Sequence, residues 1–112
     1  MKYLATIHEA AEQLRQNAEK EFVVLLQHGT MKVEYYAPQV TDKQIPHRQD
    51  ELYVITSGSG TFFRNGERTP FKTGDVIFVP AGMEHRFENF STDFAAWVIF
   101  YGKVGGEVLV SD

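Results

Sequence analysis

The stretch Gly74–Asn89 reads GDVIFVPAGMEHRFEN and has the pattern of two short strands joined by a turn. Two short runs typical of β-strands, 76–79 and 85–88, lie on either side of Pro80-Ala81-Gly82. Proline followed closely by glycine is typical of a turn that reverses the chain. We therefore expect the second run, which begins with His85, to fold back towards the strand structure that precedes it.

Short runs of this kind follow one another from Phe22 to Tyr101. Turn residues separate them, and Asn65-Gly66 is the clearest case, because both residues tolerate the positive φ of a two-residue hairpin turn. The close spacing of the runs predicts a β-sandwich or barrel. The predicted strands cover residues 22–27, 31–37, 51–56, 61–64, 68–71, 76–79, 85–88 and 94–101.

The residues before Phe22 have a different pattern. Thr6 and Glu9 have the spacing of a capping box, and apolar residues then recur at helical intervals. This predicts one amphipathic helix over about residues 7–20. We find no repeat and no linker, so we expect a single all-β domain in which an N-terminal helix, within residues 1–21, packs on a barrel formed by residues 22–112.

Composition narrows the possible functions. The 112 residues include 11 Lys and Arg against 15 Asp and Glu, a net charge of −4, with no basic run suited to a nucleic acid. With no cysteine, the chain has no disulfide, thiolate metal site or cysteine nucleophile. No apolar stretch approaches the roughly 20 residues that span a membrane. We expect no nucleic-acid or membrane partner and a cytoplasmic location.

Candidate metal ligands follow from strand geometry. Alternate residues of an extended strand share a face, so His47, Gln49, Glu51 and Tyr53 are predicted to point one way. If the strand that carries His85 faces them across a barrel, two imidazoles and one carboxylate meet. Such a triad suits Fe, Mn, Ni or Zn. On spacing alone, a simple hydrogen bond between His47 and Glu51 remains an alternative.

At these residues the chain resembles the cupin superfamily. The second cupin motif has Gly, five residues, Pro-x-Gly, two residues, His, three residues and Asn, and Gly74–Asn89 matches every position. The first motif has His-x-His, three or four residues, Glu, six residues and Gly. Glu51 and Gly58 fit it and His47 stands at its second His, but Ile45 replaces its first.

The resemblance implies a cupin-type double-stranded β-helix, or jelly-roll barrel. It also implies a divalent transition metal (Fe, Mn, Ni or Zn) held by His47, Glu51 and His85. Because Ile45 cannot ligate, water or substrate would complete the coordination. Gln49 is a candidate weak fourth ligand, or a donor that orients His47.

Aromatic side chains are candidates for a substrate pocket. Tyr53 shares the predicted inward face of Glu51, and Phe87 shares that of His85. Tyr36 and Trp97 are further candidates, on strands whose register the sequence leaves open. For each of them, packing in the core is the alternative.

The leading functional hypothesis is a metal-dependent enzyme for a small oxygen-bearing substrate: a dioxygenase, isomerase, decarboxylase or lyase. One alternative is a non-catalytic module that binds or senses a small molecule. Another is a metal-free isomerase with His47 or His85 as base and Tyr53 as acid. A last one is a barrel that serves only in oligomerisation. Apolar residues on both faces of several strands, together with the helix, predict a homodimer.

Overall fold

A computed structural model describes residues 2–108. Within this range the chain forms one helix and eight strands, which confirms an all-β fold with a single N-terminal helix. In chain order the elements are α1 (Ile7–Gln16), β1 (Phe22–His28), β2 (Met31–Tyr36), β3 (Asp50–Ser57), β4 (Ser59–Arg64), β5 (Glu67–Lys72), β6 (Val76–Val79), β7 (His85–Glu88) and β8 (Ala95–Tyr101).

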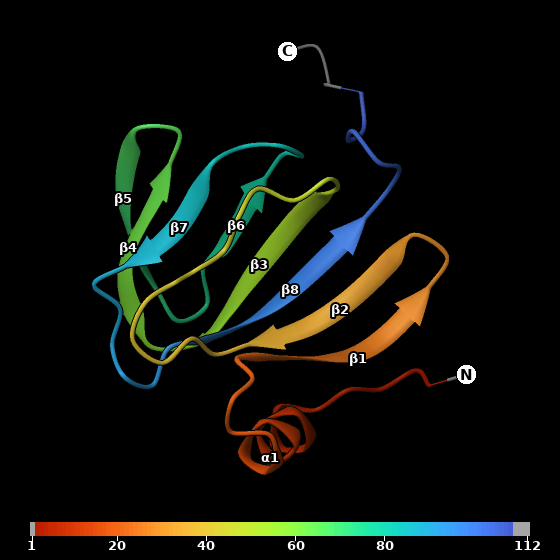
Figure 1. Cartoon of the computed structure of the whole chain (residues 1–112), viewed down its shortest axis with the longest axis vertical. Helices are drawn as coiled ribbons and strands as arrows, with labels where there is room; N and C mark the ends of the chain where they lie inside the picture. Colours follow the sequence, from red (N-terminus) through yellow and green to blue (C-terminus); the bar gives the residue numbers. More distant parts are fainter. Residues whose placement is uncertain (1, 109–112) are drawn as a thin grey trace.

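The strands form two antiparallel sheets that face each other (Figure 1). The larger sheet has the order β1-β2-β8-β3-β6, and the smaller has the order β5-β4-β7. In β3, Glu51, Tyr53 and Ile55 are buried, whereas Leu52 and Val54 between them are only half-buried. Alternation along a strand therefore places Glu51 and Tyr53 on the same inward face.

The space between the sheets is filled mainly by aromatic side chains. The ring of Phe87 lies 4.7 Å from that of Phe94 and 4.9 Å from that of Tyr53, measured between centroids. Aromatic rings at such distances add to the stabilisation that their buried area provides. The buried members of this cluster are Tyr36, Tyr53, Ile55, Phe62, Phe71, Val79, Phe87, Phe94, Ala96, Val98 and Phe100.

A second, smaller core lies on the outer face of the larger sheet, where α1 packs beside β1 (Figure 1). It includes Ala10 of α1 and Tyr35 of β2. Trp97 belongs here, with its ring edge-on to Tyr35 at 5.1 Å between centroids. The prediction of Trp97 as a pocket wall is therefore wrong: its position in β8 directs the side chain to the outer face of the sheet.

The helix is shorter than the predicted 7–20. The side chain of Thr6 accepts a hydrogen bond from the backbone N–H of Glu9, the capping contact that the sequence indicated. The helix ends at Gln16, because Asn17 has φ −130° and ψ 68°, which are not helical values. No helix in residues 2–108 has the length and apolarity needed to cross a membrane.

An irregular segment, residues 37–49, connects β2 to β3 across the gap between the two sheets (Figure 1). We call it the strap. Its Asp42 is buried and accepts hydrogen bonds from the Tyr36 hydroxyl on β2, at 2.7 Å, and from the backbone N–H of Phe87 on β7, at 2.7 Å. The strap is thus fastened to both sheets, and it carries His47 and Gln44 into the interior.

Candidate metal centre

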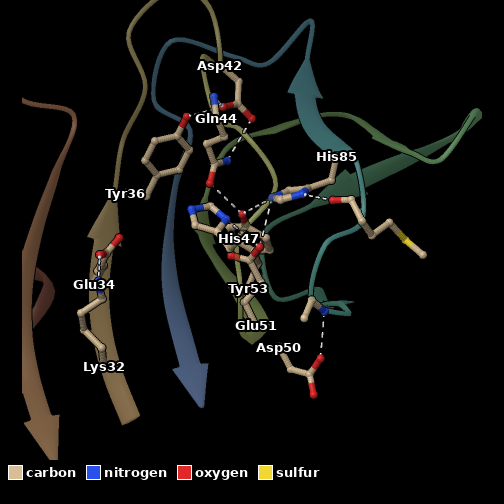
Figure 2. A network of polar contacts seen from close by, with 12 residues as sticks. Lys32, Glu34, Tyr36, Asp42, Gln44, His47, Asp50, Glu51, Tyr53 and His85 are labelled. Carbon is tan, nitrogen blue, oxygen red and sulfur yellow. Dashed lines mark hydrogen bonds and ion pairs between the residues drawn. The ribbon is translucent and has the colours of Figure 1, made fainter. Parts of the chain in front are cut away.

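Three side chains from separate parts of the chain meet between the sheets (Figure 2). His47 comes from the strap, Glu51 from β3 and His85 from the first position of β7. One oxygen of Glu51, Oε1, lies 3.1 Å from His47 Nδ1 and 3.1 Å from His85 Nε2. Each residue offers one ligand atom, and these atoms all lie within 4.8 Å of one another.

Local structure explains how the chain brings them together. Glu51 is on the inward face of β3, as strand alternation requires. The turn before β7 is held by the backbone N–H of Gly82, which donates to the His47 carbonyl at 2.7 Å. Gly82 has φ +78°, a conformation that favours glycine. The turn that begins with Pro80 thus fixes the positions of both histidines relative to each other.

The charged groups of the cluster shift one another's pKa values. Burial acts to raise the pKa of Glu51, which is 1% exposed, but hydrogen bonds and charges from His47 and His85 outweigh burial and hold this pKa below its ordinary value. Burial acts to lower the pKa of His85, yet the hydrogen bonds to Glu51 and to the Met83 carbonyl raise it overall. The cluster therefore favours an ionised Glu51 beside positive charge.

The hydrogen-bond pattern at His85 fits a cation. Its Nδ1 lies 2.9 Å from the backbone carbonyl of Met83, which only accepts, so Nδ1 carries a proton. In a neutral imidazole, Nε2 then has a lone pair that faces Glu51 Oε1. The other carboxylate oxygen, Glu51 Oε2, is buried and has no hydrogen-bond partner among the described residues. The cluster of His47, Glu51 and His85 thus offers several acceptor atoms, and such a cluster suits a metal ion.

The two distances to Glu51 Oε1 are compatible with metal coordination. Ligand atoms at about 2.0–2.2 Å from a cation stand about 3–3.5 Å from each other when their angles are near 90–109°. Both measured contacts to Glu51 Oε1, at 3.1 Å, lie in this range. Two imidazole nitrogens and a carboxylate oxygen are ligands that Fe, Mn, Ni and Zn accept.

Two residues of the site were missed in the sequence. Gln44 accepts a hydrogen bond from the Tyr53 hydroxyl at 2.9 Å, and its side-chain amide donates to Asp42 at 3.1 Å (Figure 2). Both residues lie in the irregular strap, and their contacts are with distant parts of the fold. No motif or periodic pattern marks them, so only the structure reveals them.

The predicted pocket residues Tyr53 and Phe87 lie in the interior beside the cluster. The Tyr53 hydroxyl is 3.0 Å from His85 Nε2, and burial, followed by the charge of Glu51, raises the pKa of Tyr53 well above its ordinary value. Phe87 packs against the Tyr53 ring. Tyr36 lines the cavity described below and bonds to Asp42.

Gln49, a candidate weak ligand or a donor to His47, lines the same cavity as His47, but its amide nitrogen bonds to backbone carbonyls outside the cluster. Its amide nitrogen donates to the carbonyls of Thr30, at 2.9 Å, and Gly102, at 2.8 Å. The prediction assumed an extended strand through residue 49, but β3 begins only at Asp50, so alternation does not apply to Gln49. Its side chain instead ties the end of the strap to neighbouring turns.

A cavity of about 840 Å³ opens beside His47. It lies against the inward residues of β2, including Lys32, Glu34 and Tyr36, and Ile45 of the strap also lines it. Lys32 pairs with Glu34 at 3.2 Å, and burial raises the pKa of Glu34. His47, whose side chain is 31% exposed, is the member of the cluster that faces this space.

Comparison with known families agrees with this architecture. A family model described as "Cupin domain" matches residues 31–101, which include the strap, both motifs and every member of the cluster. The chain belongs to the cupin family. The similarity is consistent with a cupin β-barrel that carries one helix.

Relatives and solved structures extend the comparison. An uncharacterized protein of Streptomyces coelicolor is 37% identical to this cupin over 81 residues, covering 70% of this chain and 77% of its own. An oxalate-binding protein of Thermotoga maritima is 46% identical over 39 residues, 35% of this chain and 32% of its own. The structure of the plu4264 protein from Photorhabdus luminescens superposes with a TM-score of 0.64 at 24% identity, covering 73% of this chain and 74% of that one.

Proposed function

We propose that this cupin binds a divalent transition metal through His47, Glu51 and His85 and uses it as an enzyme acting on a small oxygen-bearing molecule in the adjoining cavity. The observation that carries the proposal is the convergence of acceptor atoms: Glu51 Oε1 lies 3.1 Å from a nitrogen of each histidine, and Glu51 Oε2 is buried without a partner among the described residues. A bound cation would satisfy these acceptors together.

The protein residues have separate roles in this proposal. Glu51 supplies the negative charge and His85 a deeply buried nitrogen, while His47 closes the group on the cavity side. A metal held there supplies Lewis-acid polarisation of an oxygen-bearing ligand. The ring of Phe100 packs against that of His47, at 4.8 Å between centroids, and lines the same cavity.

The cavity wall favours a polar ligand. Lys32 and Glu34 present both signs of charge beside His47, and Ile45 places an apolar side chain where the cupin motif has a histidine. The relative from Thermotoga maritima that binds oxalate supports a small carboxylate as ligand. That same relative favours a second candidate function, in which the metal and cavity bind the molecule without changing it.

The metal-free isomerase alternative gains no support from the geometry. It needs Tyr53 as an acid, but the Tyr53 hydroxyl donates to Gln44 and its side chain is fully buried. Its proton is therefore not directed at the cavity.

We further propose that the protein is a homodimer. Val76 and Phe78 of the edge strand β6 are 62% and 44% exposed, and their pairing with Val54 and Leu52 places them on the outer face of the larger sheet. Tyr3 and Leu4, near the start of α1, are also exposed. A second copy of the chain that covers this apolar surface would remove it from water.

Calorimetry with oxalate tests the proposed function. Oxalate is titrated into the metal-free protein and into protein loaded with Mn²⁺, Ni²⁺ or Zn²⁺, and the mixtures are then analysed by mass spectrometry. We expect at least about tenfold tighter binding to a loaded form, equivalent to about 1.4 kcal/mol. His47→Ala, at the cavity side of the cluster, is expected to abolish this gain.

Two results would count against the proposal. Equal oxalate affinity with and without every metal would show that no metal takes part in recognition. Tight binding with no chemical change in oxalate or in a panel of other small hydroxy and keto acids would favour the binding module over the enzyme.

A further inference from the structure

A chain of buried polar groups leads from Asp42 through Gln44 and Tyr53 to His85 (Figure 2). Asp42 and Tyr53 are 7% and 0% exposed, so water does not supply alternative partners to their polar atoms. Neither the cupin motifs nor the relatives assign a role to this series of polar groups. The direction of each hydrogen bond in it follows from which groups can donate.

Asp42 sets the first direction. Each of its carboxylate oxygens accepts two hydrogen bonds: Oδ1 from the Tyr36 hydroxyl and the Gln44 backbone, and Oδ2 from the Phe87 backbone and the Gln44 side chain. An ionised carboxylate only accepts, so the side-chain nitrogen of Gln44 must face Asp42. The Gln44 carbonyl oxygen is therefore turned towards Tyr53.

Gln44 sets the second direction. Its carbonyl oxygen lies 2.9 Å from the Tyr53 hydroxyl and can only accept, so Tyr53 donates its single proton there. The Tyr53 oxygen is also 3.0 Å from His85 Nε2, but it has no second proton to give. Tyr53 thus turns a lone pair, and not a hydrogen, towards His85.

We propose that Asp42 and Gln44 are positioning residues that keep the Tyr53 proton away from the metal ligands, so that it does not compete with the cation for His85 and Glu51. This inference rests on the metal site proposed above. Without Gln44, the Tyr53 hydroxyl would rotate about its C–O bond and donate to His85 Nε2, an atom that the metal requires.

A double-mutant cycle, with metal affinity as the readout, tests whether Gln44 acts on the metal site through the Tyr53 proton. Gln44→Leu removes the acceptor, and Tyr53→Phe removes the proton that the acceptor holds. We expect Gln44→Leu to weaken Zn²⁺ or Mn²⁺ binding about tenfold, the worth of about one hydrogen bond. In the Tyr53→Phe background, the same substitution should change affinity by no more than about twofold, because the competing proton is gone.

A merely structural role for Gln44 gives a different result. The loss of packing around the strap would weaken binding by the same factor in both backgrounds, and that outcome would overturn the proposal. An unchanged affinity in Gln44→Leu would overturn it as well. Thermal unfolding of each variant, compared with wild type, establishes that the affinities are measured on folded protein.

Nuclear magnetic resonance of the metal-free protein tests the proton direction independently of any metal. In wild type, we expect the Tyr53 hydroxyl proton to give its stronger Overhauser contacts to the Gln44 side chain, and in Gln44→Leu to the His85 ring. Stronger contact with His85 in wild type would overturn the inference. If wild type binds no metal but the Tyr53 proton still points to Gln44, the proposed function is wrong. The inferred direction of the proton is then still correct.

Discussion

At the scale of single residues, the centre depends on which polar atoms carry hydrogens. His85 Nδ1–H donates a hydrogen bond to the Met83 carbonyl, and the Tyr53 hydroxyl donates one to the Gln44 side-chain oxygen. In a neutral His85, Nε2 therefore directs a lone pair at Glu51 Oε1, and Tyr53 directs a lone pair at His85 Nε2. Acceptor atoms that face one another in a buried site without a donor are unfavourable. A cation bound between them would interact favourably with each.

Glu34 provides a test of charge burial in the cavity wall. Burial raises the pKa of Glu34 above 4.5 in the folded protein, even though Lys32 acts to lower it. A carboxyl group with a raised folded-state pKa contributes its full stability below its unfolded pKa and loses it as pH rises through the folded value. Glu34→Gln has no such group and should escape this loss.

We therefore expect the free energy of unfolding of Glu34→Gln, relative to wild type, to be higher at pH 7 than at pH 4. Urea denaturation at both pH values provides the comparison. A relative stability that is unchanged between them, or lower at pH 7, would show that the Lys32 ion pair outweighs the cost of burying Glu34.

At the scale of elements, the strap and the strand connections place the site. The turn from β3 to β4 leaves almost no space for a side chain at Gly58. Gly58 has φ +85°, and a Cβ there would stand 2.6 Å from Ser91 Oγ and 2.7 Å from the Cα of Phe94. Gly66, in the turn from β4 to β5, has φ +91° but open space around it.

These two glycines form a matched pair for mutation. Gly66→Ala introduces backbone strain alone, whereas Gly58→Ala adds a steric clash with backbone atoms. We expect Gly58→Ala to lower the free energy of unfolding by about 1–3 kcal/mol more than Gly66→Ala does. Urea denaturation checks this value. Equal losses of unfolding free energy in the two variants would mean that the β3–β4 turn shifts without cost to accommodate the added Cβ.

Strand positions were largely predictable, because turn residues bound each run. The runs 76–79 and 85–88 agree with β6 and β7 at both ends. The helix was predicted too long, since the apolar periodicity continues to Ala18 beyond the last helical residue, Gln16. The strap was not predictable, because Asp42 and Gln44 are held by contacts with distant strands and not by local preference.

The same contrast applies to the site. His47, Glu51 and His85 stand out through motif spacing, and the structure brings them together. Gln49 and Trp97 were misplaced, because alternation predicts a face only when a residue is in a strand whose register is known. Residues 109–112, at the end of the predicted barrel range 22–112, lie outside the described residues.

At the scale of the whole molecule, the proposed homodimer has a direct test. Phe78 stands exposed on the outer face of β6, and Val104, 71% exposed, lies beyond β8. In sedimentation velocity, we expect wild type and the control Val104→Glu to be dimers and Phe78→Glu to dissociate, because a buried charge opposes association. A wild-type monomer at every concentration would contradict the dimer, and a dimeric Phe78→Glu would move the interface elsewhere.

The proposed function also depends on the cavity, which is lined by residues of the strap and of the inner face of β2. The two sheets hold Glu51 and His85 from opposite sides, and the strap adds His47. A ligand that enters the cavity meets His47 first, since Glu51 and His85 are almost fully buried.

Metal stoichiometry and affinity show whether His47, Glu51 and His85 hold an ion. The protein is stripped with a chelator and titrated separately with Mn²⁺, Fe²⁺, Ni²⁺ and Zn²⁺, and Glu51→Gln and His47→Ala are titrated alongside it. We predict one ion per chain for wild type and at least about a hundredfold weaker binding for either folded variant, because loss of a ligand should cost more than the roughly 10–100-fold that follows loss of a group that only orients a ligand. Wild type that binds no ion, or variants that bind as tightly as wild type, would contradict the account.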